Sequence, residues 1–169
     1  MPLTLTRRLV TFQVQGIPQP KGSTRAFVPK SWAQKAAAAG VSPRAVTTAA
    51  NPKTAGWQQL IREQAQQASP DGLFVGPIVV AVVFRFPRPA SAPKRVLHHV
   101  TKPDVDKLIR ACLDGLAGVL FADDRAVIEV RARKVFALPP TTPGADITVA
   151  EALAPEPEQS AFALFAEVD

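Results

Sequence analysis

In four segments of the chain, apolar residues either alternate with polar ones or run together, and this pattern predicts four β-strands. Residues 10–14 alternate and fit a strand with one buried face. Residues 78–86 form a continuous, largely β-branched run, which is typical of a central strand covered on both faces. Residues 127–136 alternate between charged residues and an apolar face that includes Ile128, and residues 146–150 make a short final strand.

Two other segments have the period of an amphipathic helix. Residues 54–68 place one apolar stripe toward the core: Trp57, Leu60, Ile61, Ala65 and Ala68. A second helix begins near Asp106 and has a stripe of its own: Leu108, Ile109, Cys112, Leu113 and Leu116. We therefore predict a single α+β domain in which a mixed sheet of about four strands packs against two main helices.

The remaining segments differ from these elements in composition. Residues 16–53 are rich in Pro, Ala and basic residues, which predicts a long basic loop with a helical turn near residues 34–39. Residues 154–169 are acidic, and we expect a disordered tail there. These boundaries assign residues 1–153 to the domain.

Charge is distributed unevenly along the chain, whose formal net charge is +6. No Asp or Glu precedes Glu63, although basic residues are frequent there, and after Lys134 only acidic residues carry charge. Such a basic surface favours an anionic partner, nucleic acid first, while a solvated surface would also explain it.

The single cysteine, Cys112, excludes an intramolecular disulfide. Its place on an apolar helix stripe favours a small core residue over a nucleophile. No apolar run is long enough to span a membrane, and nothing resembles a signal peptide. We expect the protein in the cytoplasm.

Five carboxylates are concentrated between residues 102 and 124 of this basic chain: Asp104, Asp106, Asp114, Asp123 and Asp124. Hard oxygen ligands grouped in this way suit Mg²⁺ or Mn²⁺. Asp104 and Asp106 flank the start of the predicted helix, so both can reach one ion. A turn after the helix can return Asp123-Asp124 toward them. The pattern predicts a metal-dependent enzyme that acts on a polyanion.

Simpler roles exist for several of these residues. Asp106, Arg110 and Asp114 are spaced four residues apart and can form ordinary surface ion pairs on a helix. Asp123-Asp124 can serve as turn residues. The preceding His98-His99 pair can bind metal or phosphate, but an ordinary loop explains it as well.

The stretch KPDVDKLIRACLDGLAGVLFADD (residues 102–124), followed by a strand and a lysine, resembles the core of the RusA-type Holliday junction resolvases of bacteria and their phages. It agrees with the family pattern at these positions: Lys102, Pro103, Asp104, Asp106, Leu108, Asp114, Leu116, Gly118, Asp123, Asp124 and Lys134. The resemblance implies that Asp104, Asp106 and Asp124 are catalytic metal ligands, with Asp123 as a further candidate.

The same resemblance places a catalytic basic residue one turn after Asp106, where this chain has Arg110. The family usually has Lys there and Asn at the position of Lys107. Arg110 keeps the charge and can contact a phosphate, although its planar guanidinium is not equivalent to an ammonium. Lys107, beside the metal site, can bind phosphate or lower the activity.

By this resemblance the protein is a Mg²⁺-dependent endodeoxyribonuclease, with Mn²⁺ as a substitute, that resolves four-way DNA junctions. Alternatives are an endonuclease for other branched or flap DNA, and a DNA-binding protein whose metal site has decayed. The expected DNA-binding residues are Lys21, Arg25, Lys30, Lys102, Lys107 and Lys134.

A four-way junction has two-fold symmetry and needs two matched cuts, which favours a C₂ homodimer. Two apolar surfaces are candidates for its interface. One is the segment 116–121, and the other comprises Phe27, Val28 and Trp32 in the basic loop.

Overall fold

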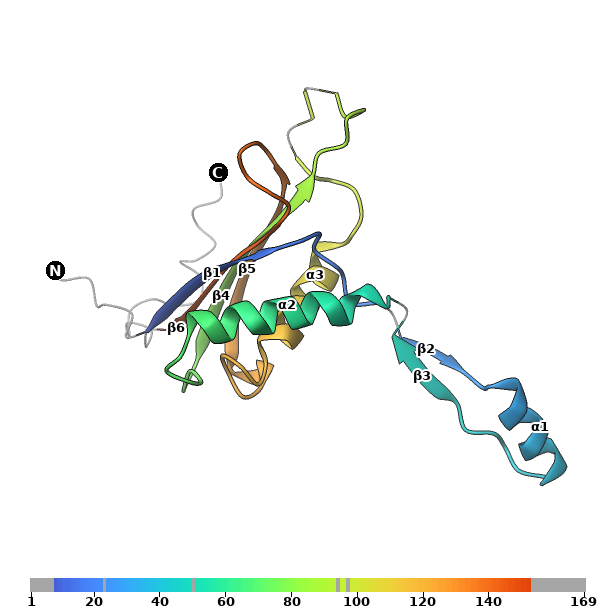
Figure 1. The fold of residues 1–169 in the computed structure, drawn as a ribbon. Helices are drawn as coiled ribbons and strands as arrows, with labels where there is room; N and C mark the ends of the chain where they lie inside the picture. The colour runs from blue at the N-terminus through green and yellow to red at the C-terminus, as the bar shows by residue number, and fades with distance from the viewer. Residues whose placement is uncertain (1–7, 23, 50, 94, 97, 153–169) are drawn as a thin grey trace, which may run out of the picture.

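The computed structural model describes residues 8–22, 24–49, 51–93, 95–96 and 98–152. Figure 1 shows the chain as a sheet with two helices packed against it and an arm that projects from one end. The elements follow in this order: β1 (Leu9–Gln15), β2 (Thr24–Phe27), α1 (Lys30–Ala38), β3 (Val46–Ala49), α2 (Lys53–Ala68), β4 (Ile78–Pro87), α3 (Val105–Leu116), the 3₁₀ turn η1 (Asp124–Ala126), β5 (Val127–Ala137) and β6 (Gly144–Glu151).

The main sheet has four strands in the order β1-β6-β4-β5. The β4–β5 pair is parallel, and the β4–β6 and β1–β6 pairs are antiparallel. The predicted α+β class and four-stranded mixed sheet are therefore confirmed. The helices predicted from periodicity are α2 and α3, and both lie within a residue or two of their predicted bounds.

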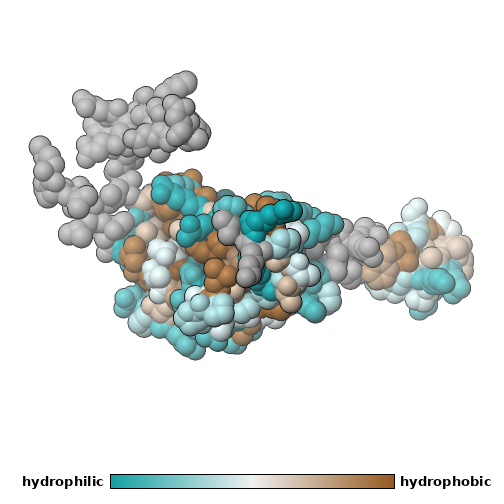
Figure 2. Space-filling view, turned by 90° about the horizontal axis from the view of Figure 1, so that it is seen from above, coloured by the Kyte–Doolittle hydropathy of each residue, from teal (hydrophilic) through white to brown (hydrophobic). Residues whose placement is uncertain are grey.

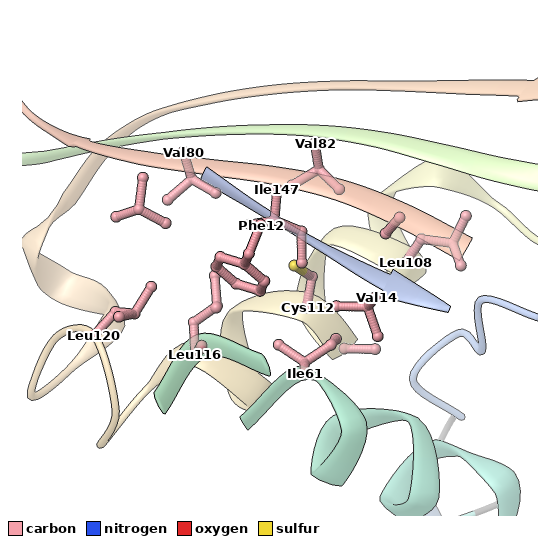
Figure 3. Packing of buried hydrophobic residues seen from close by; sticks show 14 of the residues in the cluster. Phe12, Val14, Ile61, Val80, Val82, Leu108, Cys112, Leu116, Leu120 and Ile147 are labelled. Atoms are coloured by element: carbon pink, nitrogen blue, oxygen red, sulfur yellow. The ribbon is translucent and has the colours of Figure 1, made fainter. Parts of the chain in front are cut away.

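The hydrophobic core lies between one face of this sheet and the two helices. In Figure 3, Val80 and Ile147 point from the strands toward Ile61 of α2 and toward Cys112 and Leu116 of α3. Isoleucine and leucine side chains of this core have no exposed surface, and each such burial stabilises the fold by roughly 1.5–3 kcal/mol.

The second face of β4 is only partly covered. Burial alternates along the strand, and Val79, Ala81 and Val83 are half-buried. The prediction that this strand is covered on both faces was wrong, because both core helices pack on the same side. A continuous β-branched run therefore does not by itself tell whether a strand has one covered face or two.

Two apolar residues assigned to the core are exposed. Leu60 is 41% exposed because it lies at the flank of α2, beside the stripe formed by its buried neighbours. Ile128 is 65% exposed because the ladder passes from Ile78–Val127 to Val79–Glu129, which makes it the extra residue of a β-bulge.

Residues 24–49 form what we call the arm, where the sequence predicted only a loop with one helical turn. Strands β2 and β3 pair with each other in an antiparallel sheet of their own, and α1 lies between them at the tip (Figure 1). The prediction of a loop was wrong here because two four-residue strands are too short to show a periodic pattern. Figure 2 shows apolar and hydrophilic residues mixed on the arm; Phe27, Trp32 and Val41 are about half exposed or more.

Two further predictions concern the acidic tail and the absence of a membrane-spanning segment. The acidic tail, residues 154–169, lies beyond the described residues, so the domain boundary at residue 153 stays a prediction. None of the helices in the described ranges has the length and apolar character needed to cross a membrane.

Gly144 offers a test of the packing between β1 and β6. A Cβ atom there would lie 2.1 Å from the backbone oxygen of Val14. We expect Gly144→Ala to lower the free energy of unfolding by about 1–3 kcal/mol, because the strands would have to separate. Gly56 in α2 has open space around its Cα, so Gly56→Ala is a matched control that should raise stability by about 0.5–1 kcal/mol. Urea denaturation measures both, and equal effects would contradict the packing described.

Candidate active site

Asp104 and Asp106 lie together where α3 begins. Asp104 has extended backbone angles at the N-cap position, and Asp106 is in the first helical turn. The positive end of the helix dipole stabilises negative charge at both positions. Both carboxylates are exposed, and Asp104 Oδ2 lies 3.2 Å from Lys107 Nζ. The predicted pair of carboxylates at a loop-to-helix junction is therefore present and open to solvent.

Lys134 of β5 holds the segment that leads into this pair. Its ammonium donates hydrogen bonds to the carbonyl oxygens of Thr101 and Pro103, each at 2.8 Å. Two bonds from one cation tie residues 101–103 to the sheet immediately before Asp104. Lys134 thus supports the segment that ends at a candidate metal ligand, and its predicted contact with DNA stays a prediction.

Lys21 connects the loop after β1 to α3. Its backbone N–H donates to the carbonyl of Lys107 at 2.9 Å, and its Nζ pairs with Asp114 Oδ2 at 2.6 Å. Gln58 of α2 also donates to Asp114 Oδ2, at 3.1 Å, and Arg62 donates to the Asp114 carbonyl. Asp114 therefore joins α3 to two other segments and is no part of the open site. The polar role of α2 has no signal in the sequence, because Gln58 and Arg62 look like ordinary exposed helix residues.

Arg110 lies one turn after Asp106 on α3 and is exposed. Within the part of the chain that the structure describes, no ion pair joins it to Asp106 or Asp114. The alternative in which these three residues form surface ion pairs is therefore not what the structure has. The guanidinium is available to an anion such as phosphate.

Asp123 and Asp124 have different environments. Asp123 caps η1: its Oδ1 accepts hydrogen bonds from the backbone N and the Nε of Arg125, at 2.9 and 3.0 Å. These bonds hold the pKa of the Asp123 carboxyl below its usual value. Asp123 is thus a turn residue, as the simpler interpretation held, while Asp124 is exposed at the start of η1.

The prediction that Asp124 returns to Asp104 and Asp106 within one chain was wrong. Asp124 precedes β5, and it is the far end of that strand that reaches the start of α3 through Lys134. The strand advances by seven residue steps from Val127 to Lys134, which span roughly 23 Å at 3.3 Å per step. Among the described residues, no three His, Cys, Asp or Glu side chains gather closely enough to hold a metal ion.

Two further candidates from the sequence, His99 and Cys112, are buried. His99 is buried against the rings of Phe86 and Phe136, with centroids 4.4 and 5.3 Å away. Burial and then the charge of Lys134 lower the pKa of His99, so the ring is neutral at pH 7. Cys112 has no exposed surface, which confirms it as a core residue, and this burial raises the pKa of its thiol to about 12.

The other predicted DNA-binding residues are spread over two regions. Lys102 and Lys107 lie beside the start of α3, and both side chains reach the surface. Lys30 is the exposed first residue of α1 on the arm. Arg25 lies on β2 of the arm, and its side chain is not among those described.

Two comparisons with known proteins bear on this site. The family model of the endodeoxyribonuclease RusA matches residues 22–149, which include the arm, α3 and β5. An uncharacterized protein of Bacillus subtilis, YqaN, is 28% identical over 94 residues, covering 50% of this chain and 66% of YqaN. Because the family model covers most of the chain, including every candidate carboxylate, this protein belongs to the RusA endodeoxyribonuclease family.

Proposed function

We propose that this protein is a metal-dependent endodeoxyribonuclease that resolves four-way DNA junctions by paired phosphodiester hydrolysis. The observation that carries the proposal is the exposed Asp104–Asp106 pair at the start of α3, inside the region that matches the RusA family. Exposed carboxylates on a strongly basic chain would repel a polyanion unless a cation lay between them.

The donor set of this pair fits Mg²⁺ or Mn²⁺. Such ions bind through one or two carboxylates, keep several waters and take further oxygens from substrate phosphates. Lys134 fixes the segment before Asp104, which limits how far that ligand can move. When bound, the cation would activate water and neutralise charge on the scissile phosphate.

Basic residues of α3 would orient the phosphate. Arg110 is one helical turn beyond Asp106, and it projects from the same part of the helix surface because residues four apart are neighbours. Lys107 lies 3.2 Å from Asp104 and offsets part of its charge. A phosphate at this site would therefore meet two cations from one rigid helix.

Asp124 would reach this site only from a second copy of the chain, since β5 separates it from Asp104 within one copy. Strand β5 is at an edge of the main sheet, with β4 as its one partner in the described chain. Antiparallel pairing of two β5 edges about a two-fold axis would bring the start of each strand beside the end of the other. That arrangement would place each Asp124 near the other copy's Asp104 and Asp106.

The two apolar surfaces predicted as dimer interfaces differ in how far they are exposed. Leu116, Leu120 and Phe121 are fully buried within one chain, so the segment 116–121 offers little surface to a partner. Phe27 and Trp32 on the arm are about half exposed and stay candidates. The homodimer therefore rests on symmetry and on the position of Asp124.

The arm would contribute to DNA binding. Lys30, Lys35 and Arg44 are exposed on it, and no acidic residue occurs anywhere between residues 16 and 62. A basic extension of this kind would follow the phosphate backbone independently of sequence.

The proposal is tested by incubating the protein with a synthetic four-way junction, a flap and a linear duplex of the same sequence, with Mg²⁺ or with a chelator. We expect Mg²⁺-dependent cutting of the junction and far slower cutting of the duplex. Preference for the flap would favour an endonuclease for branched or flap DNA. Binding without cutting would favour a DNA-binding protein whose metal site has decayed.

Arg110 tests the phosphate contact. We expect Arg110→Ala to slow junction cutting by about 10²–10³-fold, because a cation that stabilises transition-state charge is lost. Binding should weaken by much less. Arg95→Ala, at an exposed arginine in the loop between β4 and α3, is the control and should cut at nearly the normal rate. A rate within about threefold of normal for Arg110→Ala would limit the residue to a surface role.

A further inference from the structure

A cavity of about 420 Å³ lies beside the start of α3. It lies among the loop after β1, Asn51 shortly before α2, the end of β4 and the segment 99–103. Its walls include Ile17, Pro20, Asn51, Phe86, His99 and Lys102. A volume of this size is toward the small end of ligand sites, which suits a single planar ring system.

Two aromatic rings form one side of this cavity. His99 and Phe86 lie in contact as a tilted pair, with ring centroids 4.4 Å apart and planes inclined by 30°. Both side chains are more than nine-tenths buried. The His99 ring is neutral, and its Nδ1 is buried with no hydrogen-bond partner among the described residues. This ring nitrogen is therefore a polar atom that the described fold leaves without a hydrogen bond.

The rim of the cavity is polar and fixed in orientation. The Asn51 amide donates to the carbonyl of Pro20 at 3.1 Å, and its Oδ1 accepts from the backbone N–H of Lys53 at 3.1 Å. Lys102 supplies a positive charge on the same rim. An apolar, aromatic wall with an amide and an ammonium at its edge matches a nucleobase attached to a phosphate.

The cavity and the acidic site share one short piece of chain. Lys102 and Pro103 line the cavity, and Asp104, the candidate metal ligand, follows directly. Consecutive Cα atoms are about 3.8 Å apart, so the two sites are within reach of one nucleotide. Lys134 holds this segment in place through Thr101 and Pro103, which fixes the cavity wall relative to Asp104.

We propose that this cavity receives an unpaired nucleobase adjacent to the phosphate that is cut. The proposal rests on the proposed function, since it assumes that DNA reaches Asp104 and Asp106. Extruding a base costs least where its pairing or stacking is already weakened, as at the branch point of an open four-way junction, and costs more within a linear duplex. Capture of such a base would therefore favour branched DNA at the step of positioning, before any bond is cut.

The test uses two kinds of change. Substitutions in the protein fill the cavity, and abasic nucleotides in the junction remove the base that the cavity would receive. Ile17 lines the cavity and is 55% exposed, so Ile17→Trp adds bulk there without disturbing the core; Gln19→Trp is a second variant of the same kind. Val75→Trp is the matched control, because Val75 is 84% exposed and lies beyond the opposite end of β4. Thermal unfolding establishes that all three variants fold.

Each protein is given an intact four-way junction and junctions with one abasic nucleotide on either side of the cut. We expect the cavity-filling variants to cut the intact junction about fivefold more slowly or worse, since stacking of one base contributes on that scale. On the junction whose missing base is the captured one, variants and normal protein should cut at equal rates. Cutting of the intact junction at the normal rate by the cavity-filling variants, or an equal loss on every substrate, would overturn the proposal.

Binding of the protein to junctions in the presence of Ca²⁺ tests this proposal independently of the nuclease function. The normal protein should bind the intact junction about fivefold more tightly than the abasic one, and Ile17→Trp should not distinguish them. If no junction is cut but this difference in binding appears, the cavity is a base site on a protein that is no nuclease. If junctions are cut but the difference is absent, the base site is refuted and the nuclease stands.

Discussion

Asp106→Asn is expected to slow cutting of a four-way junction by at least about a thousandfold while leaving junction binding intact. Metal-bound charge stabilisation contributes several kcal/mol to such a reaction, and 1.36 kcal/mol corresponds to a tenfold change in rate. Asp106 is exposed in the first turn of α3, so its replacement by an amide of equal size should leave the fold unchanged. Removal of one negative charge should make binding of the phosphates equal or slightly tighter.

The control is Asp71→Asn, since Asp71 is an exposed carboxylate in the loop after α2. It should cut at the normal rate. Rates are measured at saturating Mg²⁺ with excess enzyme, so that binding does not limit them. Cutting by Asp106→Asn at a rate near normal under these conditions would remove Asp106 from the metal site.

Two inactive variants are expected to restore activity when they are combined. If each site takes Asp106 from one copy and Asp124 from the other, a mixed dimer of Asp106→Asn and Asp124→Asn has one fully damaged site and one intact site. Co-expressed or co-refolded, the two variants should nick one strand of the junction at a rate at least a hundredfold above either alone. This gain follows because the two variants leave complementary halves of the site intact.

A mixture of Asp104→Asn with Asp106→Asn is the matched control. Both residues belong to the same half of the site, so every site in that mixed dimer keeps one damaged ligand pair. No activity should return. Restoration in the control, or none in the first mixture once mixed dimers are confirmed by mass, would contradict a site shared between two copies.

Much of the fold follows from the spacing of apolar residues, and the exceptions have local causes. The stripe of Leu108, Cys112 and Leu116 predicted α3, and alternation predicted β1 and β5, because one-sided burial imposes these periods. Ile128 breaks the rule because a β-bulge is a pairing event between two strands, which one strand's sequence does not encode. The arm was missed because its short strands are stabilised by each other and not by the core.

The sequence predicted which residue types form the site, but it predicted their arrangement in space only in part. The motif around Asp104 and Asp106 placed both carboxylates at the start of a helix, where the structure has them. The distance to Asp124 depends on the direction and length of β5, which follow from the sheet order and not from the motif. The support that Lys134 gives to residues 101–103 was likewise not predicted, because the two segments are neighbours in space but distant in sequence.

The most direct test of the resolvase assignment is whether the two cuts in a four-way junction are paired and symmetric. A junction labelled on each of its four strands is incubated with Mg²⁺, and the products are resolved on native and denaturing gels before and after treatment with DNA ligase. We predict nicked linear duplexes, cut at matching positions in two strands of like polarity, that ligase reseals completely. Cuts at unrelated positions, products with gaps or flaps that ligase leaves open, or equal cutting of linear arms would contradict the assignment.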